Sequence, residues 1–255
     1  MMGMLQSSLK LRVGTVSVTA ELRPWRGARV FHSTALQADD GNAVPAAVNE
    51  ALQRVLQARR LANPRVSVSL GSALTRSGVM RFAALPRSAG DRALIVSQRF
   101  CRDYKLDGRS TVVAFSTYPQ ANGQHAVLAD AAPRALIDGL IAAAASHGLH
   151  CDIISSDLSL ALAGLPRQPA AAGLLAVFPE EGCSLVFLDA HGAPVSVATL
   201  AQDDATLADR LAARIDRYAA QSGVAIDRMA LHVRDHSGRQ AAAALSHLFT
   251  QARAA

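Results

Sequence analysis

The sequence has few of the residues that mark several common classes of protein. It holds only three cysteines, Cys101, Cys151 and Cys183, which lie far apart and form no CxxC pair. An odd number of widely spaced cysteines argues against a disulfide framework and against a zinc knuckle. We therefore expect free, buried thiols in a reducing compartment.

Lysine and aromatic residues are also scarce. Lys10 and Lys105 are the only lysines, so almost all of the positive charge behind the formal net charge of +6 comes from arginine. The arginines are spread along the chain, without the basic stripe and interleaved aromatic residues that are typical of nucleic-acid binding. We expect no nucleic-acid partner, although a mildly basic surface also suits an anionic membrane or an acidic partner.

Long apolar runs and known catalytic motifs are missing as well. No run of about 18 apolar residues occurs, and residues 1–10 lack the apolar core of a signal peptide. We therefore expect a cytosolic protein that contacts a membrane only through a partner. The absence of GxSxG, GxxxxGK[ST] and GxGxxG motifs leaves hydrolase, P-loop and dinucleotide functions without support.

The remaining candidate sites are weak. The pairs His147 with His150 and His232 with His236 have no third ligand at a metal-binding spacing, and residues 39–42 are better explained as a turn and helix cap than as a calcium loop. Cys101 and Cys183 become nucleophiles only if a base lies nearby. We expect no metal site and no catalytic residues.

Half of the composition is hydrophobic, so a chain of this length buries a substantial core. Alternating patterns predict a hairpin around Gly14 and a series of strands. The strands are expected at residues 11–22, 30–34, 65–70, 78–82, 111–117, 124–129, 151–154, 174–178, 184–188, 195–200 and 229–233. Helical spacing predicts helices at residues 44–61, 86–106, 133–148, 157–162, 203–221 and 239–252. The stretch 166–172, rich in proline and alanine, is the best internal boundary.

Three segments carry a resemblance to a known family. Residues 13–22 read Val-Gly-Thr-Val-Ser-Val-Thr-Ala-Glu-Leu. Residues 65–72 are followed by a second strand at 78–82 and by Pro86, which starts the next helix, and residues 152–157 precede a short helix. These segments and the order of the elements resemble the actin-like architecture of the PilM family of type IV pilus assembly, and of the related cytoplasmic domain of GspL in type II secretion.

The resemblance implies an α/β, actin-like (ribonuclease H-like) fold of two subdomains with an inserted small α+β module. We expect the first half, with its core hairpin and helix, at residues 1–64, the inserted module at 65–155, and the second half at 156–255. The resemblance also implies a vestigial nucleotide cleft built from Gly14, Thr15, Glu180, Gly182, Ser184 and Gly238.

The sequence departs from the family pattern at the places that hold nucleotide. Arg12 replaces the acidic residue that helps to hold the magnesium ion, and a guanidinium has donors only. Residues 177–182 read Val-Phe-Pro-Glu-Glu-Gly in place of the second phosphate loop, and bulky residues at 234–238 replace the adenosine-loop glycines. We therefore expect no cofactor and no hydrolysis. In the alternative interpretation, Glu180 takes over the role of the lost carboxylate in an active ATPase or kinase relative that binds Mg-ATP between its halves.

The function implied by the resemblance is a non-catalytic scaffold of a type IV pilus or type II secretion assembly platform. Its partner would be the cytosolic tail of a PilN-like inner-membrane protein, or an assembly ATPase, and homodimer formation is left open. The tail groove is expected to be lined by residues of two predicted strands: Val66, Val68, Leu70, Val79, Arg81 and Phe82. A third interpretation, a stand-alone module for an anionic surface, is supported by charge alone.

Overall fold

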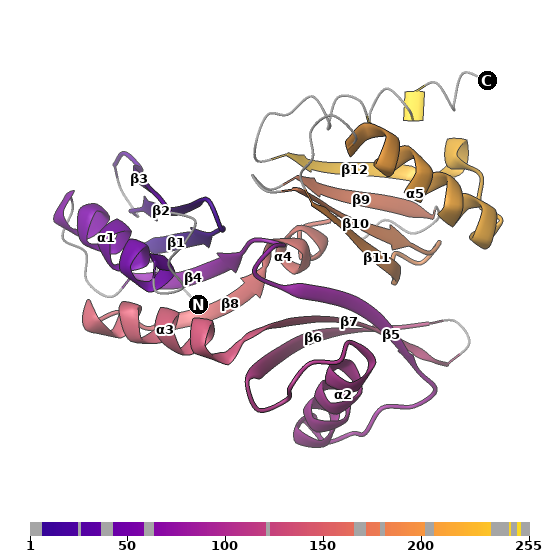
Figure 1. Cartoon of the computed structure of the whole chain (residues 1–255), viewed down its shortest axis with the longest axis horizontal. Coiled ribbons are helices and arrows are strands. Elements are labelled where there is room, and N and C mark those ends of the chain that lie inside the picture. The colour runs from indigo at the N-terminus through magenta and orange to yellow at the C-terminus, as the bar shows by residue number, and fades with distance from the viewer. Residues whose placement is uncertain are drawn as a thin grey trace, which may run out of the picture.

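The computed structural model describes residues 7–24, 27–36, 43–58, 64–120, 123–165, 172–178, 182–201 and 207–235, together with Leu245, Phe249 and Thr250. Within these residues the chain forms three β-sheets with helices packed against them (Figure 1). No helix in these ranges is both long enough and apolar enough to cross a membrane.

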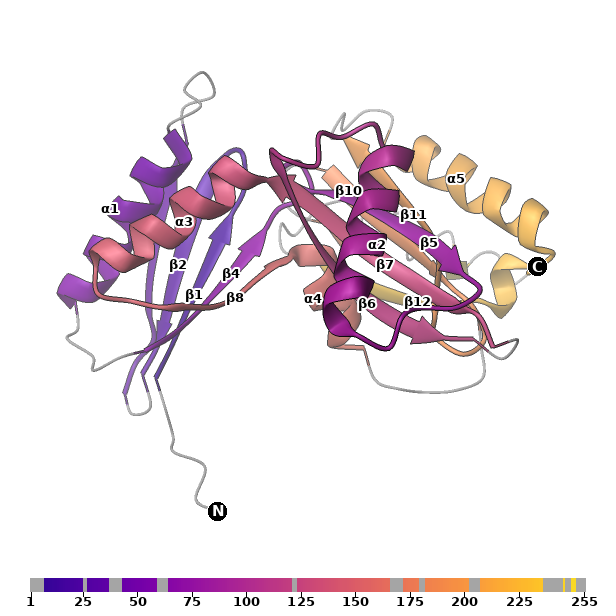
Figure 2. The same ribbon diagram turned by 90° about the horizontal axis from the view of Figure 1, so that it is seen from below.

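The first sheet has five strands in the order β3-β2-β1-β4-β8. Its strands are β1 (Ser8–Val13), β2 (Ser17–Arg23), β3 (Val30–Ala35), β4 (Arg65–Leu70) and β8 (Cys151–Ser156). The helices α1 (Ala43–Ala58) and α3 (Arg134–Ser146) lie side by side on one face of it (Figure 2). Because only this face is covered by helices, β1 and β2 alternate strictly between buried and more exposed residues.

The second sheet is a three-stranded module in the order β5-β7-β6. It contains β5 (Arg76–Phe82), β6 (Thr111–Pro119) and β7 (His125–Pro133), all antiparallel, with α2 (Ala89–Asp103) packed on it. The predicted start of α2 at Pro86 is wrong. Ser88 is the N-cap, because its side-chain oxygen accepts a hydrogen bond from the Asp91 N–H.

Not every apolar residue of the helices lies on a buried face. The side chains of Leu94 in α2 and Ile141 in α3 are 57% and 47% exposed. The buried residues of α2 are Val96, Phe100 and Cys101. In alanine-rich helices such as α3, the sequence offers few contrasts between polar and apolar positions, so the direction of the buried face is poorly specified.

The third sheet, β11-β10-β9-β12, belongs to the second half. It comprises β9 (Gly173–Phe178), β10 (Gly182–Leu188), β11 (Pro194–Ala201) and β12 (Ala230–Asp235). The helix α5 (Leu207–Ser222) packs beside it, and a 3-10 turn (Ile226–Arg228) leads into β12. Leu245 and Phe249 join its core, whereas most of the predicted closing helix at 239–252 lies outside the described residues.

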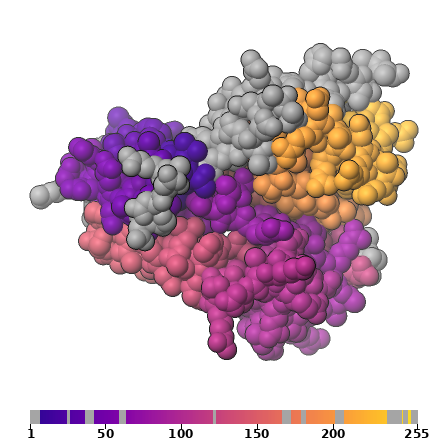
Figure 3. Space-filling model, in the orientation of Figure 1, coloured from indigo at the N-terminus to yellow at the C-terminus, as the bar shows by residue number. Residues whose placement is uncertain are grey.

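The two halves repeat one topology. β1-β2-β3-α1-β4 and β9-β10-β11-α5-β12 each consist of an antiparallel meander, a helix and a strand parallel to the first strand of the meander. Every residue of β9 is buried. One face of β9 packs on the α5 side, and the other packs against α4 (Asp157–Ala163) and the module. In the space-filling view the second half lies directly on the module (Figure 3).

The predicted domain boundaries disagree with the sheets. β4 and β8 were assigned to the inserted module, but β4 pairs in parallel with β1, and β8 pairs with β4. Both strands therefore belong to the first half. The separate sheet consists only of β5, β6 and β7, and the connection back to the first half is made by α3.

Candidate functional site

The predicted first phosphate loop is a tight turn between β1 and β2. The Gly14 N–H donates a hydrogen bond to the Ser17 carbonyl oxygen at 2.9 Å. Thr15 and Val16 lie at the tip, where the Val16 side chain is 54% exposed. Because the turn uses the Gly14 N–H internally, this donor is not available to an anion.

Arg12 lies one strand residue before this turn region and forms an ion pair with α4. Its Nε donates a hydrogen bond to Oδ2 of Asp157 at 3.1 Å, and its Nη2 lies 3.1 Å from the same oxygen. Nη2 thus contributes to the ion pair, but it forms no hydrogen bond within the described part of the chain. Asp157 is 7% exposed, so the ion pair joins the first half to α4 in a largely desolvated position.

The remaining residues of the predicted cleft belong to the second half. Gly182 and Ser184 lie in β10, where every residue is buried. Glu180 and Gly238 lie outside the described residues. A role for these residues in holding a nucleotide stays a prediction.

The predicted partner-binding strands do not line an open surface. Val66, Val68 and Leu70 are at most 2% exposed and pack in the core of the first half. Their alternation indicated an apolar face correctly. That face is covered, however, because β4 lies between β1 and β8 beneath the helices, so these three assignments are wrong for a free groove.

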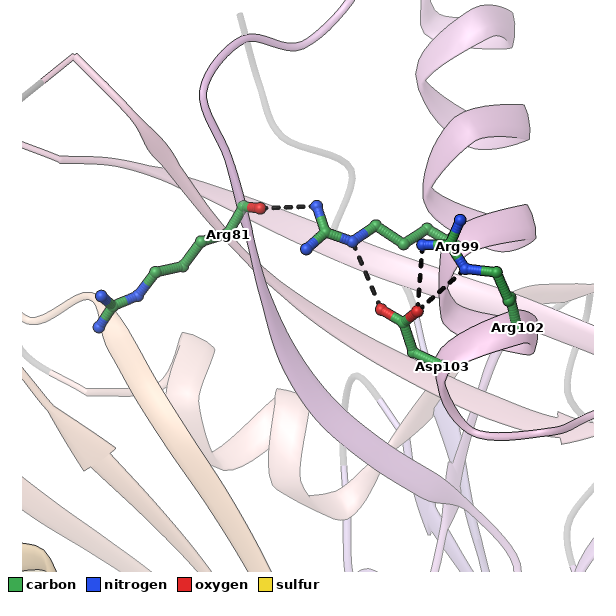
Figure 4. Close-up of polar contacts among 4 residues, drawn as sticks. All are labelled: Arg81, Arg99, Arg102 and Asp103. Atoms are coloured by element: carbon green, nitrogen blue, oxygen red, sulfur yellow. Dashed lines mark hydrogen bonds and ion pairs between the residues drawn. The ribbon is translucent and has the colours of Figure 1, made fainter.

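The three predicted partner residues of β5 differ among themselves. Val79 is partly buried against the core that the module shares with the second half, and Phe82 is 7% exposed in the module's own core. Arg81 is exposed. Its carbonyl oxygen accepts a hydrogen bond from Nη1 of Arg99 at 2.7 Å, while its side chain points away from α2 (Figure 4).

On the other side of this strand, the exposed Asp103 carboxylate pairs with two arginines of α2 (Figure 4). It accepts hydrogen bonds from Nε of Arg99 at 3.4 Å and from Nε of Arg102 at 3.2 Å. Exposed pairs of this kind contribute little stability. They do give Arg99 and Arg102 an acidic partner.

A groove of about 1040 Å³ lies where the first half, the module and the second half meet. The first half and the module contribute residues 72–77, 110–111 and 131–135, with Tyr104, Leu106 and Asp138. The second half contributes residues 197–199 of β11 and Arg214 of α5. None of the predicted partner-binding residues of β4 and β5 lines this groove. Its residues 72–77 fall between the two groups in the sequence.

Tyr104 shapes one wall of the groove. Its ring stacks on Phe100 with 4.3 Å between centroids, and the Arg76 guanidinium carbon lies 5.3 Å from its ring centroid. Burial raises the pKa of Tyr104, and the nearby positive charge of Arg76 lowers it in part. The phenol is therefore a neutral hydrogen-bond donor at physiological pH.

A buried carboxylate joins the module to the connection between the halves. Asp130 of β7 is 8% exposed and accepts three hydroxyl hydrogen bonds. The donors are Ser77 at 2.5 Å, Ser156 at 2.7 Å and Ser159 at 2.5 Å. Ser156 is also the N-cap of α4, so the same contacts hold β5, β8 and α4 together.

The other candidates from the sequence find little support. No group of three or more potential metal ligands occurs among the described residues. His147 caps the C-terminal end of α3, His150 lies near Asp152, and His236 and residues 39–42 fall outside the described ranges. Burial raises the pKa of Cys183 to about 12, so this thiol is not a ready nucleophile.

Several residues of this region were not singled out by the sequence patterns, notably Tyr104, Asp130, Arg134 and Arg214. They come from the C-cap of α2, from β7, from α3 and from α5, and no short-range spacing connects them. The sequence offered one signal for Asp130, because it is a charged residue within the apolar run of β7. Asp130 interrupts an otherwise apolar sequence, which is typical of a buried, hydrogen-bonded group.

No protein-family model matches the sequence, and a search of curated proteins finds no match. Solved structures do match. The PilM-PilN type IV pilus biogenesis complex gives a TM-score of 0.60 at 17% identity, over 96% of this chain and 73% of that chain. The cytoplasmic domain of EpsL, an inner-membrane component of the type II secretion system of Vibrio cholerae, gives a TM-score of 0.54 at 14% identity. This match covers 98% of this chain and 95% of that chain.

A protein of Bacteroides thetaiotaomicron with an actin-like ATPase fold and unknown function gives a TM-score of 0.60 at 10% identity, over 96% of this chain and 88% of that chain. Identities this low establish the fold and no more. The predicted fold class is confirmed: the chain has a mixed α/β, actin-like fold that is structurally similar to PilM and to the cytoplasmic domain of EpsL.

Proposed function

We propose that the chain is a non-catalytic, actin-like scaffold of a type IV pilus or type II secretion assembly platform. Its partner would be the cytosolic tail of a PilN-like inner-membrane protein, and an assembly ATPase would be a second partner. The observation that carries the proposal is the groove where the first half, the module and the second half meet, on a fold similar to those of PilM and EpsL. The protein would then be cytoplasmic and held at the inner membrane through this partner.

The ion pair between Arg12 and Asp157 supports the non-catalytic part of the proposal. A magnesium-bound triphosphate needs carboxylate oxygens near the phosphate loops. Here the guanidinium of Arg12 occupies the strand position before Val13 and Gly14, and it engages the Asp157 carboxylate at 3.1 Å. Mg-ATP would have to break this pair, in addition to finding other ligands for its metal ion.

The docking part is tested by affinity capture from a detergent-solubilised membrane fraction. Ala135 is an exposed residue of α3 that lines the groove, and Ala135→Trp should fill it and abolish capture of the partner. Ala46→Trp is the matched control, because Ala46 is an exposed α1 residue that does not line the groove. Capture of no pilus or secretion component by the wild-type chain would refute the proposal.

The absence of nucleotide binding is tested separately by thermal unfolding with millimolar Mg-ATP. A ligand present at one hundred times its dissociation constant stabilises a protein by about 2.7 kcal/mol. We expect no shift of the melting temperature for the wild-type chain. A clear shift would support the alternative function, an active actin-like ATPase or kinase relative.

A further inference from the structure

The groove carries an excess of positive charge that its own residues do not neutralise. Arg76 of β5, Arg134 of α3 and Arg214 of α5 line it, and Asp138 is the one acidic residue among the lining residues that the structure describes. Three arginines against one aspartate leave a formal excess of two positive charges. All three arginines are exposed to the groove or to solvent.

Unlike some arginines of the molecule, these three have no acidic partner within the described part of the chain. Arg23 pairs with Glu21, Arg12 with Asp157, and Arg99 with Asp103. No ion pair of Arg76, Arg134 or Arg214 is formed among the described residues, and Arg76 lies over the Tyr104 ring instead. Arginine forks bind carboxylates in two-point contacts, so unpaired forks along a groove favour a carboxylate-bearing ligand.

Arg134 does not pair with Asp138, although they lie four residues apart on α3. Its Nε donates a hydrogen bond to the Arg109 carbonyl oxygen at 2.9 Å, and its Nη2 donates to the Thr111 carbonyl oxygen at 3.4 Å. These contacts fix the guanidinium where it lines the groove, and Nη1 of Arg134 forms no hydrogen bond within the described part of the chain. The charge of Arg134 is thus held in place without being neutralised.

The size and remaining lining of the groove favour an extended peptide over a small anion. Its volume lies at the upper end of the range for pockets that hold drug-sized molecules. Leu74, Leu106 and Val197 add apolar surface to the lining, and Ser72, Thr75 and Thr199 add hydroxyl groups. We propose that the segment bound in this groove is acidic, with carboxylates that pair with Arg76, Arg134 and Arg214. This inference rests on the proposed function, because it specifies the chemistry of the tail that docks there.

Selection of random twelve-residue peptides on the full chain tests this chemistry. Selected peptides should be enriched in Asp and Glu, and their affinity should fall as salt rises. The variant Arg76→Glu/Arg214→Glu should bind them about tenfold more weakly or worse, which corresponds to about 1.4 kcal/mol. Arg217→Glu is the matched control, because Arg217 is an exposed residue of α5 that does not line the groove. This variant should bind the selected peptides with nearly the affinity of the wild type.

Selected peptides that are neutral or basic, or that bind the double variant and the wild type equally well, would overturn the inference. Displacement of a selected peptide by submillimolar inorganic phosphate or by phosphatidylglycerol vesicles would overturn it too, in favour of a small anion or a lipid surface. The two proposals fail separately. If the wild type and the double variant capture a secretion or pilus component equally well, only the inference that the bound segment is acidic fails. If the chain binds acidic peptides but captures no such component, only the proposed function fails.

Discussion

Arg12 and Asp157 are 145 residues apart in the chain, yet their side chains meet where the first half joins α4. Arg12 is 26% exposed and Asp157 is 7% exposed, so the pair is much better shielded from water than the surface pairs of α2. Removing one partner of such a pair leaves a poorly solvated charge, which is a larger effect than the loss of an exposed pair.

The substitution Arg12→Asp places a second carboxylate against Asp157, so we expect it to lower the free energy of unfolding by about 2 kcal/mol or more. The charge swap Arg12→Asp/Asp157→Arg should recover a large part of the loss. Urea unfolding of the wild type, the single variant and the swap measures both effects. Equal stability of the single variant and the wild type at low salt would show that the pair does not hold the two segments together.

At the scale of single elements, β5 and α2 fit together through a glycine. A Cβ atom at Gly78 would lie 1.8 Å from Oη and 2.4 Å from Cζ of Tyr104. Tyr104 cannot easily move aside, because its ring is stacked on Phe100, which is fully buried. Glycine at this strand position therefore allows the tyrosine to cross the strand and form the groove wall.

We expect Gly78→Ala to displace the Tyr104 ring and lower the free energy of unfolding by about 1–3 kcal/mol, the range for overpacked sites. In a Tyr104→Ala background the same substitution should have little effect, because the clash is gone. A double-mutant cycle by urea unfolding gives the coupling. Gly90→Ala in α2, where the nearest atom to the new Cβ lies 3.8 Å away, is the control and should be neutral or stabilising. Additive effects of the two substitutions would contradict this account.

For the whole molecule, the contacts of Asp130 join the module to the first half and to α4. The carboxylate lies on the module and accepts hydroxyl groups from β5, from the end of β8 and from α4. The module also shares an apolar core with the second half, in which Leu128, Leu158 and Val186 are buried. The polar contacts and this core together bind the module to both halves, and the groove is formed at their meeting point.

Asp130→Ala removes the acceptor of three hydroxyl groups, so we expect it to lower the free energy of unfolding by about 3 kcal/mol. Hydrogen exchange should become faster in β8 and α4, where two of the donors lie. Ser77→Ala removes one of the three hydrogen bonds and should cost about 1 kcal/mol. If the two variants were equally stable, Asp130 would not have the connecting role described here.

The local elements were largely predictable because hydrophobic periodicity and turn residues are local properties of the chain. The alternation at residues 65–70 predicted β4 with its observed limits, and Gly148, with a φ of +69°, follows the C-cap of α3 near the predicted end. The order of strands and helices, together with three short segments that resemble the PilM family, predicted the actin-like fold class.

Only the tertiary structure decided what each face meets. The apolar residues of β4 were read as a surface for a partner, but helices cover them, because periodicity shows that a face is apolar without showing what covers it. Likewise, the sequence alone indicated that Arg12 replaces an acid, whereas its pairing with Asp157 follows from the fold. The groove depends most on tertiary structure, since its arginines come from three elements that are distant in sequence, and their charges combine only after the sheets have packed.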